Sequence, residues 1–118
     1  MARLLVDGMN VIGSRPTGWW RDRRGAMREL VSELDRYARE SGDEVAVVFD
    51  GRPFELDAEL VDVAFASRRG RDAADDDIAA RANSEVTVVT SDSRLAERAR
   101  GTGARVVGAG AFRRRLES

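Results

Sequence analysis

The chain has 118 residues, 42% of them hydrophobic and 6% aromatic, with a formal net charge of −1. This length suits one domain with a single aliphatic core, over residues 1–118. No apolar run is long enough to span a membrane and no leader pattern opens the chain, so we expect a cytoplasmic protein. The absence of cysteine, histidine and lysine excludes thiol catalysis, Ser-His-Asp triads, Schiff-base chemistry and a Walker P-loop.

The first predicted element is a buried strand that begins at Leu4 and ends at Asp7. Gly8 permits a sharp turn or a close backbone approach, and turn residues fill 11–18. Ligands of open α/β sheets bind at the carboxyl ends of strands, which makes Asp7 the first candidate site residue. Trp19 and Trp20 could stack nucleic-acid bases, although packing of one of them under the next helix is the more ordinary use.

A helix is predicted over 22–41, because its apolar residues recur at the spacing of one buried stripe. Asp22 can cap its start, Gly42 can end it, and Asp35 falls on the outer, charged face. The second strand, 44–50, has an unbroken apolar centre and ends in Asp50, which is typical of a parallel sheet. The third strand, 60–66, alternates apolar and polar residues and therefore fits an edge of the sheet.

The second half of the chain continues the alternation. A basic loop over 67–72 leads into a short helix over 74–83, followed by a strand over 85–90 and a helix over 93–100. A short strand over 104–107 and a last helical segment over 111–116 complete the chain. Strands alternating with helices predict a three-layer α/β/α sandwich with a mainly parallel sheet of about five strands, a Rossmannoid architecture.

This topology places all the strand carboxyl ends on one edge, and several acids follow those ends. The residues expected there are Asp7, Asn10, Asp50, Ser67, Asp75, Asp76, Asp77 and Asp92. Each acid alone has a structural explanation, such as capping a helix or holding a turn. Several carboxylates in one place repel, however, unless a cation neutralises them. We therefore expect one or two Mg²⁺ or Mn²⁺ ions, which would activate a water and stabilise charge on a phosphate.

Arginines cluster apart from these acids, at 21–24, 68–71 and 113–115. Such segregated patches allow a basic rim that holds a polyanion beside an acidic centre. Arg68, Arg69 and Arg71 are the first candidates for binding phosphates, because their loop leads into the acidic helix, and Arg21 is a further candidate. Any one of these clusters taken alone could equally be ordinary solvated surface.

Four motifs, read together and in order, resemble the signature of NYN domains. They are Asp7-Gly8-Met9-Asn10, Val48-Phe49-Asp50-Gly51, Ala74-Asp75-Asp76-x-Ile78 and Thr90-Ser91-Asp92. The resemblance is greatest to the YacP-like branch, within the PIN-like nuclease superfamily, and covers about 4–107. It implies a metal-dependent endoribonuclease, and some relatives act on ribosome-associated mRNA.

The resemblance also implies roles for individual residues. Asp7 matches the first acid of the family and Asn10 its partner amide, while Asp75 and Asp92 match the later acids. Asp76 adjoins Asp75 in the motif, and Asp50 matches a branch-specific acid that binds metal directly or through water. The position one turn after the last motif holds alanine where some relatives carry another acid, which leaves the number of metals open.

Other classes fit less well. A haloacid-dehalogenase-like phosphatase needs a second acid where this chain has Met9, and it usually needs a lysine. A response-regulator receiver also lacks its lysine here. The serious alternative is a module that binds RNA or the ribosome without cutting, and the sequence leaves the oligomeric state, monomer or homodimer, open.

Overall fold

The computed structural model describes residues 1–66, 70 and 72–118. Within them, five parallel strands form one sheet in the order β3-β2-β1-β4-β5, which confirms the predicted α/β architecture. In chain order the elements are β1 (Arg3–Asp7), α1 (Gly8–Gly13), the 3₁₀ turn η1 (Trp19–Arg21), α2 (Arg23–Ser41), β2 (Glu44–Phe49), β3 (Asp62–Phe65), α3 (Ala73–Arg81), β4 (Thr87–Val89), α4 (Ser93–Gly101), β5 (Arg105–Val107) and α5 (Ala109–Glu117). β1 is central and β3 lies at an edge, as predicted.

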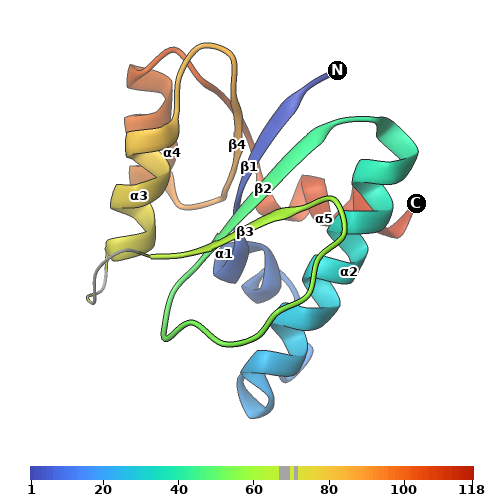
Figure 1. The fold of residues 1–118 in the computed structure, drawn as a ribbon. Helices are drawn as coiled ribbons and strands as arrows, with labels where there is room; N and C mark the ends of the chain where they lie inside the picture. Colours follow the sequence, from blue (N-terminus) through green and yellow to red (C-terminus); the bar gives the residue numbers. More distant parts are fainter. Residues whose placement is uncertain (67–69, 71) are drawn as a thin grey trace.

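Helices cover both faces of the sheet, with α1, α2 and α5 on one face and α3 and α4 on the other (Figure 1). Adjacent residues of β1 serve different faces: Val6 packs in the α2 layer and Leu5 in the α3 layer. Successive side chains of a strand point to opposite faces, so a strand buried on both sides reads as a continuous apolar run. No helix in the described part of the chain is long and apolar enough to cross a membrane.

The register of the central strands brings their carboxyl ends level. Val6 of β1 lies beside Val47 of β2 and Val89 of β4. Asp7 therefore ends β1 at the edge where the chain leaves β2 for Asp50 and leaves β4 for Thr90. The sheet alone thus assembles three polar positions from segments far apart in the sequence.

The residues after β1 form a helix, α1, and not the turn that the sequence suggested. Six residues with a glycine at each end carry too little periodicity to predict a helix. Gly8 does not turn the chain but allows the backbone to pack closely against Phe49. A Cβ atom placed at Gly8 would lie 2.5 Å from Cδ1 of the buried Phe49. The expected close approach at Gly8 is confirmed, and the expected sharp turn is wrong.

The long helix α2 follows its predicted stripe. Its buried apolar residues are Met27, Leu30, Val31, Leu34 and Ala38. The Asp22 carboxylate caps the helix by accepting a hydrogen bond from the N–H of Gly25 at 3.0 Å. Gly42 ends it with a φ of 76°, a left-handed conformation that glycine adopts without strain.

Asp35 contradicts its predicted place on the solvent face, because it is only 9% exposed. Its carboxylate accepts hydrogen bonds from the backbone N–H groups of Glu59, Leu60 and Val61, each at 3.0 Å. Burial tends to raise the pKa of Asp35, but these three bonds outweigh it and hold the pKa below its ordinary value. Asp35 therefore fixes the long loop that precedes β3 onto α2.

Asp35→Ala should destabilise the protein by about 2–3 kcal/mol at pH 7, because a buried N–H loses its acceptor. A lowered pKa in the folded state means that this stabilisation is present at neutral pH and is lost as the pH falls below the ordinary aspartate pKa. Urea unfolding at pH 7 and pH 3 measures both effects, with Glu40→Ala, an exposed acid of the same helix, as control. An equal loss at both pH values would show that the carboxylate charge is irrelevant to this contact.

Candidate active site

Asp7 is the most buried acid at the carboxyl edge of the sheet, with only 6% of its surface exposed. Its Oδ2 accepts a hydrogen bond from the Thr90 hydroxyl at 2.9 Å. The pKa of Asp7 is raised to about 6, with burial as the largest cause. The hydrogen bond from Thr90 lowers the pKa, and the charges of Asp75, Asp50 and Asp92 raise it further. Three of the predicted acids are therefore close enough to act electrostatically on the fourth.

Asp75 lies half-buried in the first turn of α3, on the opposite face of the sheet from α2. Burial raises its pKa, the charges of Asp92, Asp72 and Asp50 raise it further, and Arg98 partly offsets them. Each carboxylate makes the next harder to ionise, as expected for like charges in a poorly solvated place. The structure thus brings acids from the ends of β1, β2 and β4 and from the start of α3 into one electrostatic cluster.

Asn10 lies on α1, where its side chain holds the loop that follows β4. Its Oδ1 accepts a hydrogen bond from the backbone N–H of Ser91 at 2.7 Å. The Ser91 hydroxyl in turn accepts from the N–H of Ala109 at 2.8 Å, at the start of α5. The predicted partner amide therefore ties three segments together, and its amide oxygen is engaged with the backbone.

Asp92 caps α4, because its Oδ1 accepts a hydrogen bond from the N–H of Leu95 at 2.9 Å. The N–H of Asp92 donates to the Thr90 hydroxyl oxygen at 3.1 Å, and that hydroxyl donates to Asp7. Thr90 is 2% exposed and was not among the predicted site residues. Its position in the sequence could have indicated Thr90 as a site residue, since a hydroxyl directly after a buried strand lies beside the carboxyl ends of the neighbouring strands.

Two further predicted acids are also half-buried. Asp76 forms an ion pair with Arg98 of α4, with 2.8 Å between Oδ1 and Nη1. Asp50 is half-buried just after β2, and its backbone carbonyl accepts a hydrogen bond from Nη2 of Arg23 at 3.1 Å. Asp50 adds negative charge to the cluster, whereas the charge of Asp76 is partly balanced by its arginine.

The predicted phosphate-binding residues are only partly described. Arg68, Arg69 and Arg71 lie outside the described residues. Arg21 is exposed, with its guanidinium carbon 6.0 Å from the centroid of the Trp20 ring. Trp19 packs against the main core while Trp20 is 59% exposed, so one tryptophan of the pair takes the structural role expected of it.

The donor set suits a hard cation, because every candidate ligand is a carboxylate or an amide oxygen. Within residues 1–66, 70 and 72–118, no three acidic side chains form a ready-made metal site. Mg²⁺ does not require one, since it usually keeps several waters and binds through one or two carboxylates together with substrate phosphates. The residues therefore fit a metal that is coordinated partly by water, and not a metal coordinated by protein ligands alone.

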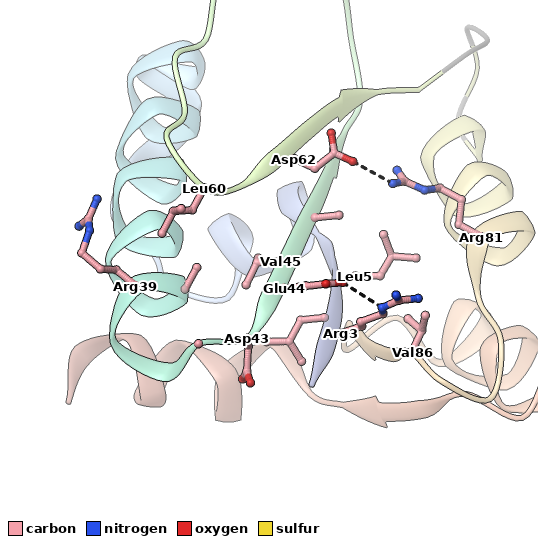
Figure 2. A pocket seen from close by; sticks show the side chains of 14 residues that line it. Arg3, Leu5, Arg39, Asp43, Glu44, Val45, Leu60, Asp62, Arg81 and Val86 are labelled. Atoms are coloured by element: carbon pink, nitrogen blue, oxygen red, sulfur yellow. Dashed lines mark hydrogen bonds and ion pairs between the residues drawn. The ribbon is translucent and has the colours of Figure 1, made fainter. Parts of the chain in front are cut away.

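A cavity of about 700 Å³ opens at the other end of the sheet (Figure 2). Its lining includes the first residues of β1, β2 and β3, which are Arg3, Glu44 and Asp62. Four of its charged residues form two ion pairs, at 2.9 Å between Arg3 and Glu44 and at 3.4 Å between Arg81 and Asp62. This cavity and the acid cluster are thus separate features at opposite ends of the strands.

A family model for the YacP-like NYN domain matches residues 4–118, nearly the whole chain. The chain belongs to the YacP-like NYN domain family. The crystal structure of Rae1 (YacP) from Bacillus subtilis is similar to this NYN domain, with a TM-score of 0.80 and 27% sequence identity, over 99% of this chain and 74% of that chain. A second Rae1 structure, with one tryptophan-to-leucine substitution, gives a TM-score of 0.81 and 27% identity over 99% and 76% of the two chains.

The search of curated proteins found no match to this NYN domain. Family membership and the similarity to Rae1 indicate a PIN-like nuclease, for which nucleic acid is the implied substrate. The NYN family also suggests metal-dependent activity. The acid cluster at the carboxyl edge of the sheet is where this NYN domain has residues suited to that chemistry.

Proposed function

We propose that this NYN domain is a metal-dependent endoribonuclease that hydrolyses phosphodiester bonds of single-stranded or flexible RNA. The observation that carries the proposal is the buried Asp7 carboxylate, whose pKa is raised to about 6 by burial and by neighbouring acids. Keeping such a group ionised at neutral pH is unfavourable without a counter-charge, and a divalent cation supplies one. Asp7 would thus be poorly accommodated in the free protein and well accommodated with metal.

Mg²⁺ or Mn²⁺ would be held by Asp7, Asp75 and Asp92, with Asp50 and Asp76 as further ligands. When bound, such an ion lowers the pKa of a water and stabilises negative charge on a phosphate. All other contributions to the proposed catalysis come from residues of the protein.

The remaining residues position these carboxylates. The Thr90 hydroxyl fixes the orientation of Asp7, and its contact with the N–H of Asp92 links the two acids. Asn10 holds the Ser91 backbone, so the loop that carries Asp92 stays at a fixed distance from α1. A site supported this way needs little reorganisation when substrate binds, which favours catalysis.

The test is cleavage of a labelled, unstructured RNA oligonucleotide by the purified protein. Cleavage should require Mn²⁺ or Mg²⁺ and should stop with EDTA. Asp75→Asn should lower the rate by roughly 100-fold or more, as expected for loss of a metal ligand or a comparable electrostatic group. Glu97→Gln removes one negative charge from an exposed position of α4 and should leave the rate nearly unchanged. Cleavage that persists in EDTA would remove the metal mechanism.

The alternative function is a non-catalytic module that binds RNA or the ribosome. A protein that binds the oligonucleotide but never cuts it, across metals and substrates, would establish that alternative. A DNA oligonucleotide of the same sequence, assayed in parallel, decides whether RNA is the preferred strand.

A further inference from the structure

The arginines of the described chain fall into two groups. Six of them form ion pairs with carboxylates: Arg3, Arg15, Arg39, Arg81, Arg98 and Arg113. Eleven others have no carboxylate partner among the described residues, and five of these lie in two short segments, 21–28 and 52. These five are Arg21, Arg23, Arg24, Arg28 and Arg52. Unpaired cations concentrated in one place are free to meet an anion from outside the protein.

Phe54 organises two of these arginines into a platform. The guanidinium carbons of Arg24 and Arg28 lie 4.7 Å and 5.2 Å from the centroid of its ring. The two arginines are four residues apart and so project from the same face of α2. Phe54 itself is half-buried and packs edge-on against Phe65 at 5.6 Å, which anchors the ring. A guanidinium that stacks by its face keeps its N–H groups available for a phosphate.

Arg23 connects this platform to the acid cluster. Its Nη2 donates to the backbone carbonyl of Asp50 at 3.1 Å, so the start of α2 is fixed to the loop that leaves β2. The first turns of α2 extend beyond the carboxyl ends of the strands, beside that loop (Figure 1). The arginines therefore lie at the same end of the molecule as Asp7, away from the cavity at the other end.

Trp20 adds an exposed aromatic ring to the same place. It is 59% exposed, and it meets Trp19 edge-on with 6.0 Å between ring centroids. Trp19 packs against the core, so the exposed indole stands on a fixed support. Exposed rings beside unpaired arginines are the combination that binds single-stranded nucleic acid, because bases stack on the ring and phosphates meet the cations.

We propose that this surface is the track along which an RNA strand approaches the acid cluster. We call it the basic ridge, and it consists of Trp20, Arg21, Arg23, Arg24, Arg28, Arg52 and Phe54. Arg24 and Arg28 hold successive phosphates, and Trp20 stacks one base. The direction of the strand toward Asp7 rests on the proposed nuclease function, whereas binding by the basic ridge does not require cleavage. The occupant is single-stranded, since inside a duplex both faces of a base are covered by the neighbouring base pairs.

The experiment measures binding of a fluorescein-labelled, unstructured RNA by anisotropy, in EDTA so that no cleavage occurs, at several salt concentrations. The double variant Arg24→Gln/Arg28→Gln should lower the salt dependence, log K against log[salt], by about 1.4 and weaken binding roughly 10- to 30-fold at 0.1 M salt. Trp20→Leu should weaken binding about fivefold or more while leaving the salt dependence unchanged. The control is Arg100→Gln/Arg105→Gln, which removes two charges from the amino-terminal end of the strands and should bind as wild type.

The outcomes separate the basic ridge from the nuclease function. If wild type binds and both ridge variants lose affinity as stated, the basic ridge is established even if no metal ever supports cleavage. If wild type cleaves RNA but the ridge variants bind and cleave normally, the basic ridge is not the RNA-binding surface, and the proposed nuclease function is kept. Two other results would overturn the proposal that the basic ridge binds RNA. One is a wild-type protein that fails to bind RNA at low salt, and the other is a control variant that loses as much affinity as the ridge variants. All of the substituted residues are exposed, and thermal melts of each variant verify that the fold is kept.

Discussion

Asp7→Asn should lower the rate of metal-dependent RNA cleavage by at least about 1,000-fold, while the protein stays folded. Asparagine has nearly the same shape as aspartate and can still accept the hydrogen bond from Thr90, so the packing at the end of β1 is kept. The variant lacks the negative charge that would hold the cation, and Mn²⁺ should raise the melting temperature of wild type but not of the variant. Cleavage by the variant at the wild-type rate would contradict the central role of Asp7.

The same substitution should make the metal-free protein more stable at neutral pH. The pKa of Asp7 is about 6 in the folded state against 3.8 for an unperturbed group, so the folded protein prefers the protonated form. Holding the charged form in the fold costs about 3 kcal/mol above pH 6, and this cost disappears as the pH falls toward 4. Urea unfolding in EDTA at pH 8 and at pH 4 measures the difference, with the exposed Asp57→Asn as control. An advantage of Asp7→Asn that does not shrink at pH 4 would show that ionisation of Asp7 is not its source.

Gly8→Ala should destabilise the protein by about 2–4 kcal/mol, although alanine normally favours a helix over glycine. The added methyl group would meet the ring of Phe49, which is fully buried and cannot move aside. Because Gly8 follows Asp7 directly, relief of the clash would displace the acid, and cleavage should fall as well. Urea unfolding and the cleavage assay measure the two effects.

Gly13→Ala is the matched control, at the other end of the same short helix. A Cβ atom there would meet no atom within 4 Å, and the backbone of Gly13 is not left-handed. Its stability should change by less than about 1 kcal/mol, toward greater stability, because alanine restricts the unfolded chain. Equal losses in the two variants would mean that flexibility of α1, and not the contact with Phe49, accounts for the glycine at position 8.

The parts of the fold that the sequence predicted are those governed by local periodicity. The α2 stripe and the two-sided burial of β1 and β2 follow from the spacing of apolar residues and require no knowledge of partners. β3 was also predicted correctly at an edge, because its alternating pattern leaves one face polar. Chain order then placed Asp7 and Asp50 at one edge, since parallel strands joined by helices run in the same direction.

The parts that the sequence did not reveal depend on contacts between distant residues. Asp35 sits in a helix whose other charges face water, and only the loop 24–26 positions later explains its burial. Arg113 belongs to a basic run that looked like surface, yet it is 8% exposed and its Nη1 donates to both carboxylate oxygens of Glu33, at 2.9 and 3.2 Å. Buried ionisable groups of this kind are set by their partners, and a partner 80 positions away leaves no local pattern.

The candidate site shows the same division. Strand ends predicted which acids would gather, and the charges of neighbouring acids that raise the pKa values of Asp7 and Asp75 agree with that gathering. The hydrogen bonds that orient the acids could not be predicted, because the Thr90 hydroxyl reaches Asp7 across 83 positions of sequence. The assignments of metal ligands and phosphate-binding residues remain predictions that the experiments above address.

The most direct test of metal binding at Asp7 is a crystal of the wild-type protein soaked in Mn²⁺, with anomalous scattering recorded at a wavelength that identifies manganese. We expect an anomalous peak at the carboxyl edge of the sheet, about 2.2 Å from an oxygen of Asp7 and from an oxygen of Asp75 or Asp92. A crystal of protein that cleaves RNA with Mn²⁺ but shows no peak at that edge, or binds Mn²⁺ only elsewhere, would contradict metal binding at Asp7.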